Sequence, residues 1–184
     1  VGGGIVGIAT AYFLGEAGVP SVVIERDSVG SHASGFAYGG LNPLAGEGIP
    51  GPLFPVANDG MRLHRELARS LPEETGVTTE FRPKPSLALA FTEREVDDAR
   101  SRIKWQREQE GYTVSWCDAA EARAIEPRIS PEALGAVYLE GAAEVEPYRF
   151  MLALTQAAER RGATIRHGRV TGLTRRNGRV SAVA

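Results

Sequence analysis

The sequence contains little sulfur and no long apolar run, and both shortages limit what the protein can be. Cys117 is the only cysteine among 184 residues, so a disulfide framework is excluded and a reducing, cytoplasmic compartment is expected. No apolar run approaches the ~20 residues that cross a bilayer, so we expect no membrane span. The net charge of -2 and the isoelectric point near 6.0 argue against a nucleic-acid partner, which favours a strongly basic surface.

Residue groups typical of metal centres and of hydrolase triads are missing as well. No group of histidine, cysteine and acidic residues has metal-ligand spacing, so we predict no metal site.

There is no initiator methionine, and the last residues, RVSAVA, stop within a strand-like pattern. We therefore expect a fragment that is truncated at both ends. Its 42% apolar and 24% charged residues still suffice for a globular core.

Apolar spacing and turn residues predict alternating helices and strands. A long segment rich in glycine, proline, serine and alanine, 27–55, interrupts them, and long loops in compact domains tend to be functional. Asn177-Gly178 is a two-residue hairpin signal. Helices are expected over 5–17, 58–71, 92–110, 118–124 and 147–161, and strands over 21–25, 86–91, 112–116, 134–139, 163–167, 170–173 and 180–183.

The opening glycines carry the most specific pattern. Gly2, Gly4 and Gly7 form G-x-G-x-x-G, followed by a helix, a strand and the acidic Glu25 about twenty residues later. This order is the βαβ fingerprint of dinucleotide binding. The first glycine allows a tight turn, the second lets a pyrophosphate approach the backbone, and the third lets the helix pack closely. The helix N-terminus then presents unpaired N–H groups to the phosphates.

Three stretches of the sequence resemble one enzyme family. They are GGGIVGIATAYFLGEAGVPSVVIER, GSHASGFAYGGLNP at 30–43, and the segment from Glu144 to the end. In order and spacing they resemble the FAD-dependent amine oxidoreductases of the D-amino-acid oxidase and glycine oxidase superfamily. The resemblance covers nearly the whole chain. It implies an N-terminal part of such a protein.

The resemblance implies cofactor contacts residue by residue. The FAD pyrophosphate would be lined by Gly2, Gly4, Ile5, Val6 and Gly7. Glu25 would bind the adenosine ribose, with Arg26 near the adenine, and Ser34 would face the phosphates.

Two more segments would contact the cofactor. Tyr38, Gly40 and Leu41 belong to the run that passes the flavin ring in the family, and Val170 matches a valine whose backbone meets the adenine. From the residues alone, Val170 could equally be a core strand residue, and the role of Arg26 is open to the same degree. The alternative for Ser34 is an ordinary loop hydroxyl, and the cofactor role is favoured over it.

The implied fold class is α/β. A Rossmann-like FAD-binding domain, of the glutathione-reductase βαβ type, would comprise 1–44 and a return segment, 144–184. The residues between them, 45–143, would be part of an inserted α+β substrate-binding domain. Some relatives bind FAD covalently through a histidine where this chain has Ala37, and His32 lies too early to replace it. We therefore expect non-covalent FAD.

The implied function is oxidation of the C–N bond of an amino acid or secondary amine by hydride transfer to flavin, with oxygen or a quinone as electron acceptor. The family's main substrate contacts lie in its C-terminal half, so the catalytic residues stay unknown, and we expect this fragment alone to be inactive. The oligomeric state, the amine and the acceptor stay open.

Three alternative functions stay open. The segment ASGFAYGGLNPL also resembles the flavin domain of a tRNA wobble-uridine modification enzyme. A nicotinamide-dependent dehydrogenase is disfavoured because such enzymes do not usually place a long Gly/Ala/Ser segment after the second strand's acid. A non-catalytic flavin-fold binding protein is the third alternative.

Overall fold

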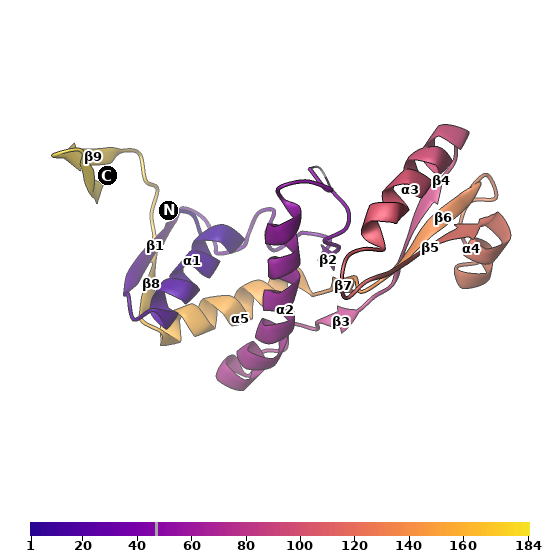
Figure 1. The fold of residues 1–184 in the computed structure, drawn as a ribbon. Coiled ribbons are helices and arrows are strands. Elements are labelled where there is room, and N and C mark those ends of the chain that lie inside the picture. The colour runs from indigo at the N-terminus through magenta and orange to yellow at the C-terminus, as the bar shows by residue number, and fades with distance from the viewer. Residues whose placement is uncertain (47) are drawn as a thin grey trace. The chain divides into compact units, whose positions relative to one another are not determined.

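Long-range contacts divide the computed structural model into two units (Figure 1). The structure describes residues 1–46 and 48–184. The first unit comprises Val1–Gly39, Glu66–Glu80 and Val145–Ala184, and the second comprises Gly40–Arg65 and Phe81–Glu144. The inserted domain expected from the sequence, 45–143, includes 66–80. In the structure the residues Glu66–Glu80 belong to the first unit. The reason is their apolar face, because Leu67 and Leu71 are buried in the first unit's core.

The first unit is built on a parallel strand pair. β1 (Ser21–Glu25) pairs with β8 (Ala163–His167), so that Glu25 lies opposite His167 at their carboxyl ends. Both strands were expected at these bounds. Two helices, α1 (Ile5–Glu16) and α5 (Pro147–Arg160), pack against each other and against the strands. This is the βαβ-type frame that places a helix N-terminus beside a strand's carboxyl end.

α5 buries a stripe of small and apolar residues. Ala153, Leu154 and Ala157 are at most 1% exposed, and the small alanines allow the close approach of α1. The helix begins as the sequence predicts, with Pro147 at its first turn, and Glu146 caps it by accepting the N–H groups of Tyr148 and Arg149.

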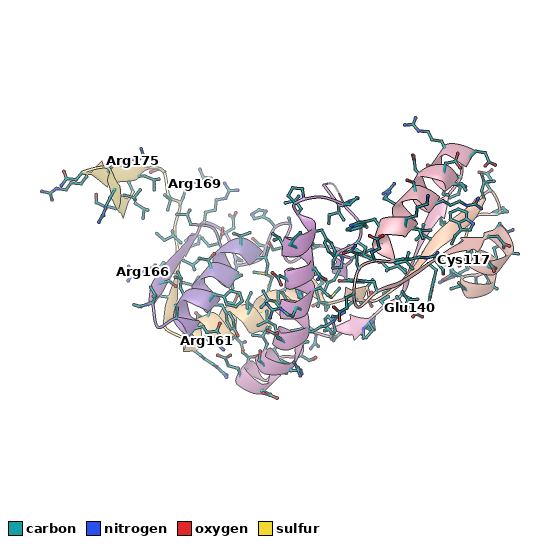
Figure 2. All side chains as sticks on the ribbon, viewed as in Figure 1. Cys117, Glu140, Arg161, Arg166, Arg169 and Arg175 are labelled. Atoms are coloured by element: carbon teal, nitrogen blue, oxygen red, sulfur yellow. The ribbon has the colours of Figure 1, made fainter. Side chains whose placement is uncertain are left out.

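α5 ends at Arg160, one residue earlier than expected, and Arg161, which is labelled in Figure 2, follows as its C-cap residue. The guanidinium of Arg161 donates to Glu74 at 3.0 and 2.8 Å and pairs with Glu16 at 3.3 Å. It also lies over the ring of Tyr12, 4.1 Å from the ring centre. These contacts tie α1 and the C-terminal part of α2 (Phe54–Thr75) to the end of α5.

The chain closes the first unit with a hairpin. β9 (Leu173–Arg176) and β10 (Arg179–Val183) are antiparallel, and Asn177 and Gly178 both have positive φ, at 53° and 74°. The hairpin prediction is confirmed, since a two-residue turn of this kind needs both residues there. The strand expected over 170–173 is wrong: β9 begins at Leu173, and the backbone groups of Thr171 and Gly172 before it bond to Ala184.

The second unit holds two antiparallel sheets. In the larger, β6 (Gly135–Glu140) lies between β4 (Ser86–Ala90) and β5 (Thr113–Asp118), and Leu139 faces both Ser86 and Val114. Its core contains Ile103, Val114 and Leu139. The smaller sheet has the order β2 (Gly40–Leu41), β7 (Ala143–Glu144), β3 (Arg82–Pro83). Sequence patterns missed these three strands, because two residues are too few to show an alternation.

Two capped helices accompany the larger sheet. α3 (Glu93–Gln106) begins with the predicted capping box of Thr92 and Glu95, and α4 (Ala119–Ile125) begins with a second one. α3 ends four residues before the predicted end. α2 extends beyond the predicted 58–71 at both ends and contains Pro72. Among the described residues no helix is both long and apolar enough to cross a membrane.

Candidate cofactor site

Two glycines of the opening turn each disfavour a side chain, Gly2 through its backbone conformation and Gly7 through a close backbone contact. Gly2 has φ 95°, in the left-handed region, and its N–H donates to the carbonyl of Ile24 at 2.9 Å. A Cβ on Gly7 would lie 1.9 Å from the carbonyl oxygen of Gly2. The turn and the first turn of α1 are therefore in contact through their backbones.

α1 begins without a capping side chain from its own N-cap residue, Gly4. The first helical bond runs from the N–H of Ile8 to Gly4, so the N–H groups of Ile5, Val6 and Gly7 precede it. Ile5 donates to the hydroxyl oxygen of Ser34 at 2.9 Å. A Cβ on Gly4 would lie 3.1 Å from the same oxygen. This helix N-terminus carries a serine hydroxyl and backbone N–H groups that precede the first helical bond, and it is therefore suited to an anion.

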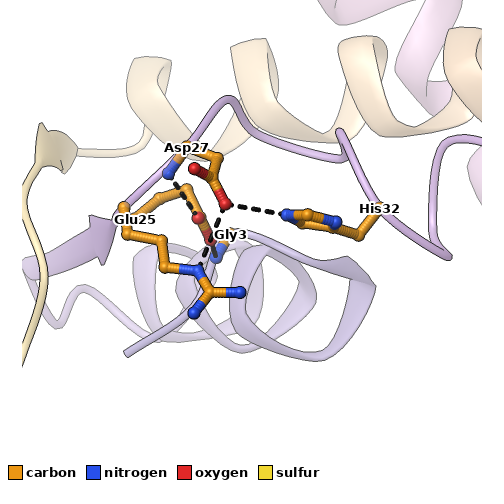
Figure 3. Close-up of polar contacts among 5 residues, drawn as sticks. Gly3, Glu25, Asp27 and His32 are labelled. Carbon is orange, nitrogen blue, oxygen red and sulfur yellow. Dashed lines mark hydrogen bonds and ion pairs between the residues drawn. The ribbon is translucent and has the colours of Figure 1, made fainter.

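Glu25 ends β1 with its carboxylate held by two backbone amides (Figure 3). Gly3 donates to Oε2 at 2.6 Å and Asp27 donates to Oε1 at 2.8 Å. The N–H of Asp27 first, and then that of Gly3, lower the pKa of Glu25 below its ordinary value. Glu25 is therefore ionised near neutral pH and acts as a hydrogen-bond acceptor.

The loop after Glu25 is tied back to the glycine turn. Gly30 donates to the carbonyl of Gly3 at 3.0 Å. Asp27 pairs with the ring of His32 at 2.8 Å and with Arg26 at 3.2 Å (Figure 3). The hydrogen bond from His32 is the largest cause that lowers the pKa of Asp27. These contacts support the segment that carries Ser34 to α1.

Two cavities adjoin this arrangement in the first unit. One, of about 430 Å³, runs along α1 from Ile5 to Leu14 and along the N-terminal half of β1. The other, of about 450 Å³, lies at the carboxyl ends of β1 and β8. Ligands of parallel α/β sheets bind at this end of the strands. The second cavity is lined by Gly2, Glu25, Arg26, Gly168, Arg169 and Val170, together with Val1 and Ile24.

Most of the residues predicted from the sequence meet at these cavities. The first brings together Gly2, Gly4, Ile5, Val6, Gly7 and Ser34. Glu25, Arg26 and Val170 meet Gly2 at the second. Tyr38 belongs to the first unit and is exposed, and Gly40 and Leu41 form β2 in the second unit. None of these three residues lines either cavity. Gly40 and Leu41 also belong to a different unit from the residues that line the cavities.

Two residues of this arrangement, Gly3 and Arg169, are not among the site residues that the sequence predicts. Gly3 acts through its backbone N–H, which every residue except proline possesses, so its residue type gave no signal. Arg169 lines the second cavity because it follows β8, a strand parallel to β1. The rule that ligands lie beyond the carboxyl ends of parallel strands could have found it.

The residues fit a dinucleotide cofactor. The glycine turn leaves room for a pyrophosphate, the amides of α1 and Ser34 offer donors, and the ionised Glu25 offers an acceptor to sugar hydroxyls. Among residues 1–46 and 48–184 no three His, Cys, Asp or Glu side chains gather so that they could hold a metal ion.

Comparisons with known proteins agree in pointing to one family. A family model described as DAO, FAD dependent oxidoreductase, matches residues 1–184. The glycine oxidase of Geobacillus kaustophilus is 34% identical over 166 residues, which are 90% of this chain and 44% of that protein. The crystal structure of glycine oxidase from Bacillus cereus superposes with a TM-score of 0.85 at 29% identity, over 99% of this chain and 50% of that one.

A more distant relative is human mitochondrial dimethylglycine dehydrogenase, which is 30% identical over 176 residues, 91% of this chain and 19% of that protein. The chain thus spans about half the length of the glycine oxidases that it matches.

Proposed function

Since the chain belongs to the DAO family of FAD-dependent oxidoreductases, we propose that it is the FAD-binding part of an enzyme that oxidises the C–N bond of an amino acid or secondary amine. The observation that carries the proposal is the glycine turn at α1, placed directly beside the amide-held carboxylate of Glu25. A turn of this kind, followed at the strand's end by an ionised acceptor, is suited to a dinucleotide and to little else.

The proposal assigns separate tasks to the two cavities. The amides of Val6 and Gly7, with the Ser34 hydroxyl, would hold the pyrophosphate at the first cavity. Glu25 would accept hydrogen bonds from the adenosine ribose at the second, with Arg26 and Val170 near the adenine. This division follows the charges, because α1 offers N–H donors and Glu25 offers oxygen acceptors.

We propose the first unit as the FAD-binding domain and the second unit as part of the substrate-binding domain. Tyr38, Gly40 and Leu41 stay candidates for the residues that pass the flavin ring. When bound, the flavin supplies a two-electron acceptor for a hydride from the amine. The chain's own residues orient the cofactor for this step. We further propose that the cofactor is held non-covalently, because Ala37 offers no nucleophile where some relatives have a histidine.

The test uses the full-length protein that contains this chain. Its visible spectrum is recorded, and glycine, sarcosine, proline and D-amino acids are then added one at a time without oxygen. We expect a flavin spectrum that one of these amines bleaches, and a flavin that acid precipitation releases. A protein without flavin would refute the assignment of the glycine turn. A flavin that no small amine bleaches would refute the substrate class and favour an amine carried on a macromolecule.

A further inference from the structure

We propose that Arg169 is a further binding residue of the cofactor site, and that its guanidinium stacks on the adenine base. The inference rests on the proposed FAD-binding function and deepens it.

Backbone contacts place Arg169 beside Glu25. The N–H of Gly168, the residue before it, donates to the carbonyl of Glu25 at 2.8 Å. This bond extends the pairing of β8 with β1 past the last strand residue and holds the start of the next segment at the end of β1. Arg169 and Glu25 therefore line the same cavity although they are 144 positions apart in the sequence.

Arg169 is the cation of this cavity that is not engaged by an acid. Arg26, which also lines the cavity, donates to Asp27 at 3.2 Å. Arg169 is exposed, and no acidic side chain pairs with it in the part of the chain that the structure describes. The carboxylate of Glu25 accepts from the amides of Gly3 and Asp27, and among the described residues it forms no ion pair with Arg169. The guanidinium of Arg169 is thus available to a ligand.

The chemistry of the cavity favours a nucleoside. An ionised carboxylate accepts from sugar hydroxyls, whereas a planar guanidinium stacks on aromatic faces. Arg169 lines only the cavity at the strand ends and not the one along α1, where the phosphate donors lie. Its partner is therefore the base and not the pyrophosphate.

The experiment measures FAD binding to the flavin-free, full-length protein by the quenching of flavin fluorescence. Arg169→Ala should raise the Kd for FAD about three- to ten-fold, the range expected for loss of one stacked guanidinium. Arg169→Lys should raise it nearly as much, because lysine keeps the charge and loses the planar stacking group. Arg166→Ala is the matched control: Arg166 is also an exposed arginine, on β8, and it does not line the cavity (Figure 2). It should stay within two-fold of the wild type, about the scatter for a surface change.

Four outcomes would overturn the inference. An unchanged Kd for Arg169→Ala would mean that the guanidinium makes no contact. Full affinity in Arg169→Lys would mean that only charge matters, as for a phosphate. An equal rise of the Kd in Arg166→Ala would mean that the effect comes from the overall positive charge of the arginines and not from a contact made by Arg169. A wild-type protein that binds no FAD would refute the proposed function itself. This result differs from failure of the Arg169 inference alone, in which the wild type binds FAD and only the variants give the wrong result.

Discussion

Each unit contains a helix whose first turn adjoins the end of a strand, and the two helix ends are built in opposite ways. In the second unit, α3 closes its N-terminus with its own residues: Thr92 accepts from Glu95, and Glu95 accepts from Thr92 and Phe91. In the first unit, α1 starts on Gly4, which has no side chain to cap it, and its first amide bonds instead to the Ser34 hydroxyl, 29 positions away. A helix end that serves stability satisfies its own amides, whereas one that serves binding leaves them for a ligand.

The largest expected effect tests whether the two units are separate. Leu154→Ala removes a side chain that is 1% exposed in the first core, and Leu139→Ala removes one that is 4% exposed in the second. Each should lower the free energy of unfolding by about 2–5 kcal/mol. Hydrogen exchange should show faster opening mainly in the unit that carries the change. Equal loss of protection in both units would contradict the division.

The next effect compares one helical glycine from each unit. Gly7→Ala places a Cβ 1.9 Å from the carbonyl of Gly2, whereas Gly60 in α2 has open space around it. We expect Gly7→Ala to cost about 1–3 kcal/mol of stability, as overpacking does, and to abolish FAD binding. Gly60→Ala should stabilise the protein by roughly 0.5–1 kcal/mol and leave the Kd unchanged. Thermal melts and FAD titrations check both, and a tolerated Gly7→Ala would remove the main support for the turn.

A smaller effect separates the two helix ends directly. Thr92→Ala removes the cap of α3 and should cost about 1 kcal/mol without changing the affinity for FAD. Ser34→Ala removes the partner of the Ile5 amide and should instead raise the Kd for FAD several-fold, with a smaller change in stability. Denaturant unfolding and FAD titration of both variants form the test. If the two variants behave alike, the proposed difference between the helix ends does not hold.

The smallest effect concerns the exposed contact that supports the Ser34 loop. Because the hydrogen bond from His32 lowers the pKa of Asp27, the contact is complete above the ordinary carboxyl range and is lost as the pH falls through the lowered pKa. His32→Ala should return the pKa of Asp27 toward its ordinary value, so the contribution of Asp27 is lost at a higher pH. Carboxyl NMR titration measures this shift, with His167→Ala as a control on β8. A pKa of Asp27 that does not move would exclude His32 as its main partner.

Local patterns in the sequence were sufficient for much of the first unit. The spacing from Gly2 to Glu25 predicts α1 and β1, because glycine sterics and apolar periodicity act within a few residues. Asn177-Gly178 predicts the hairpin for the same reason, and Thr92 with Glu95 predicts the start of α3. The strand over 170–173 was misplaced because its pairing depends on Ala184, which its own residues do not reveal.

The amino-acid sequence alone determined where the backbone can turn without a side chain, where the helices begin, and that an acid follows β1. These properties depend on sterics and on hydrogen bonds between near neighbours. Only the tertiary structure decided that the carboxylate of Glu25 meets the amide of Gly3, that Ser34 caps α1, and that Arg169 joins Glu25 at one cavity. Those contacts join residues 22, 29 and 144 positions apart. They exist because parallel pairing of β1 with β8 and the packing of α1 and α5 bring distant backbone together.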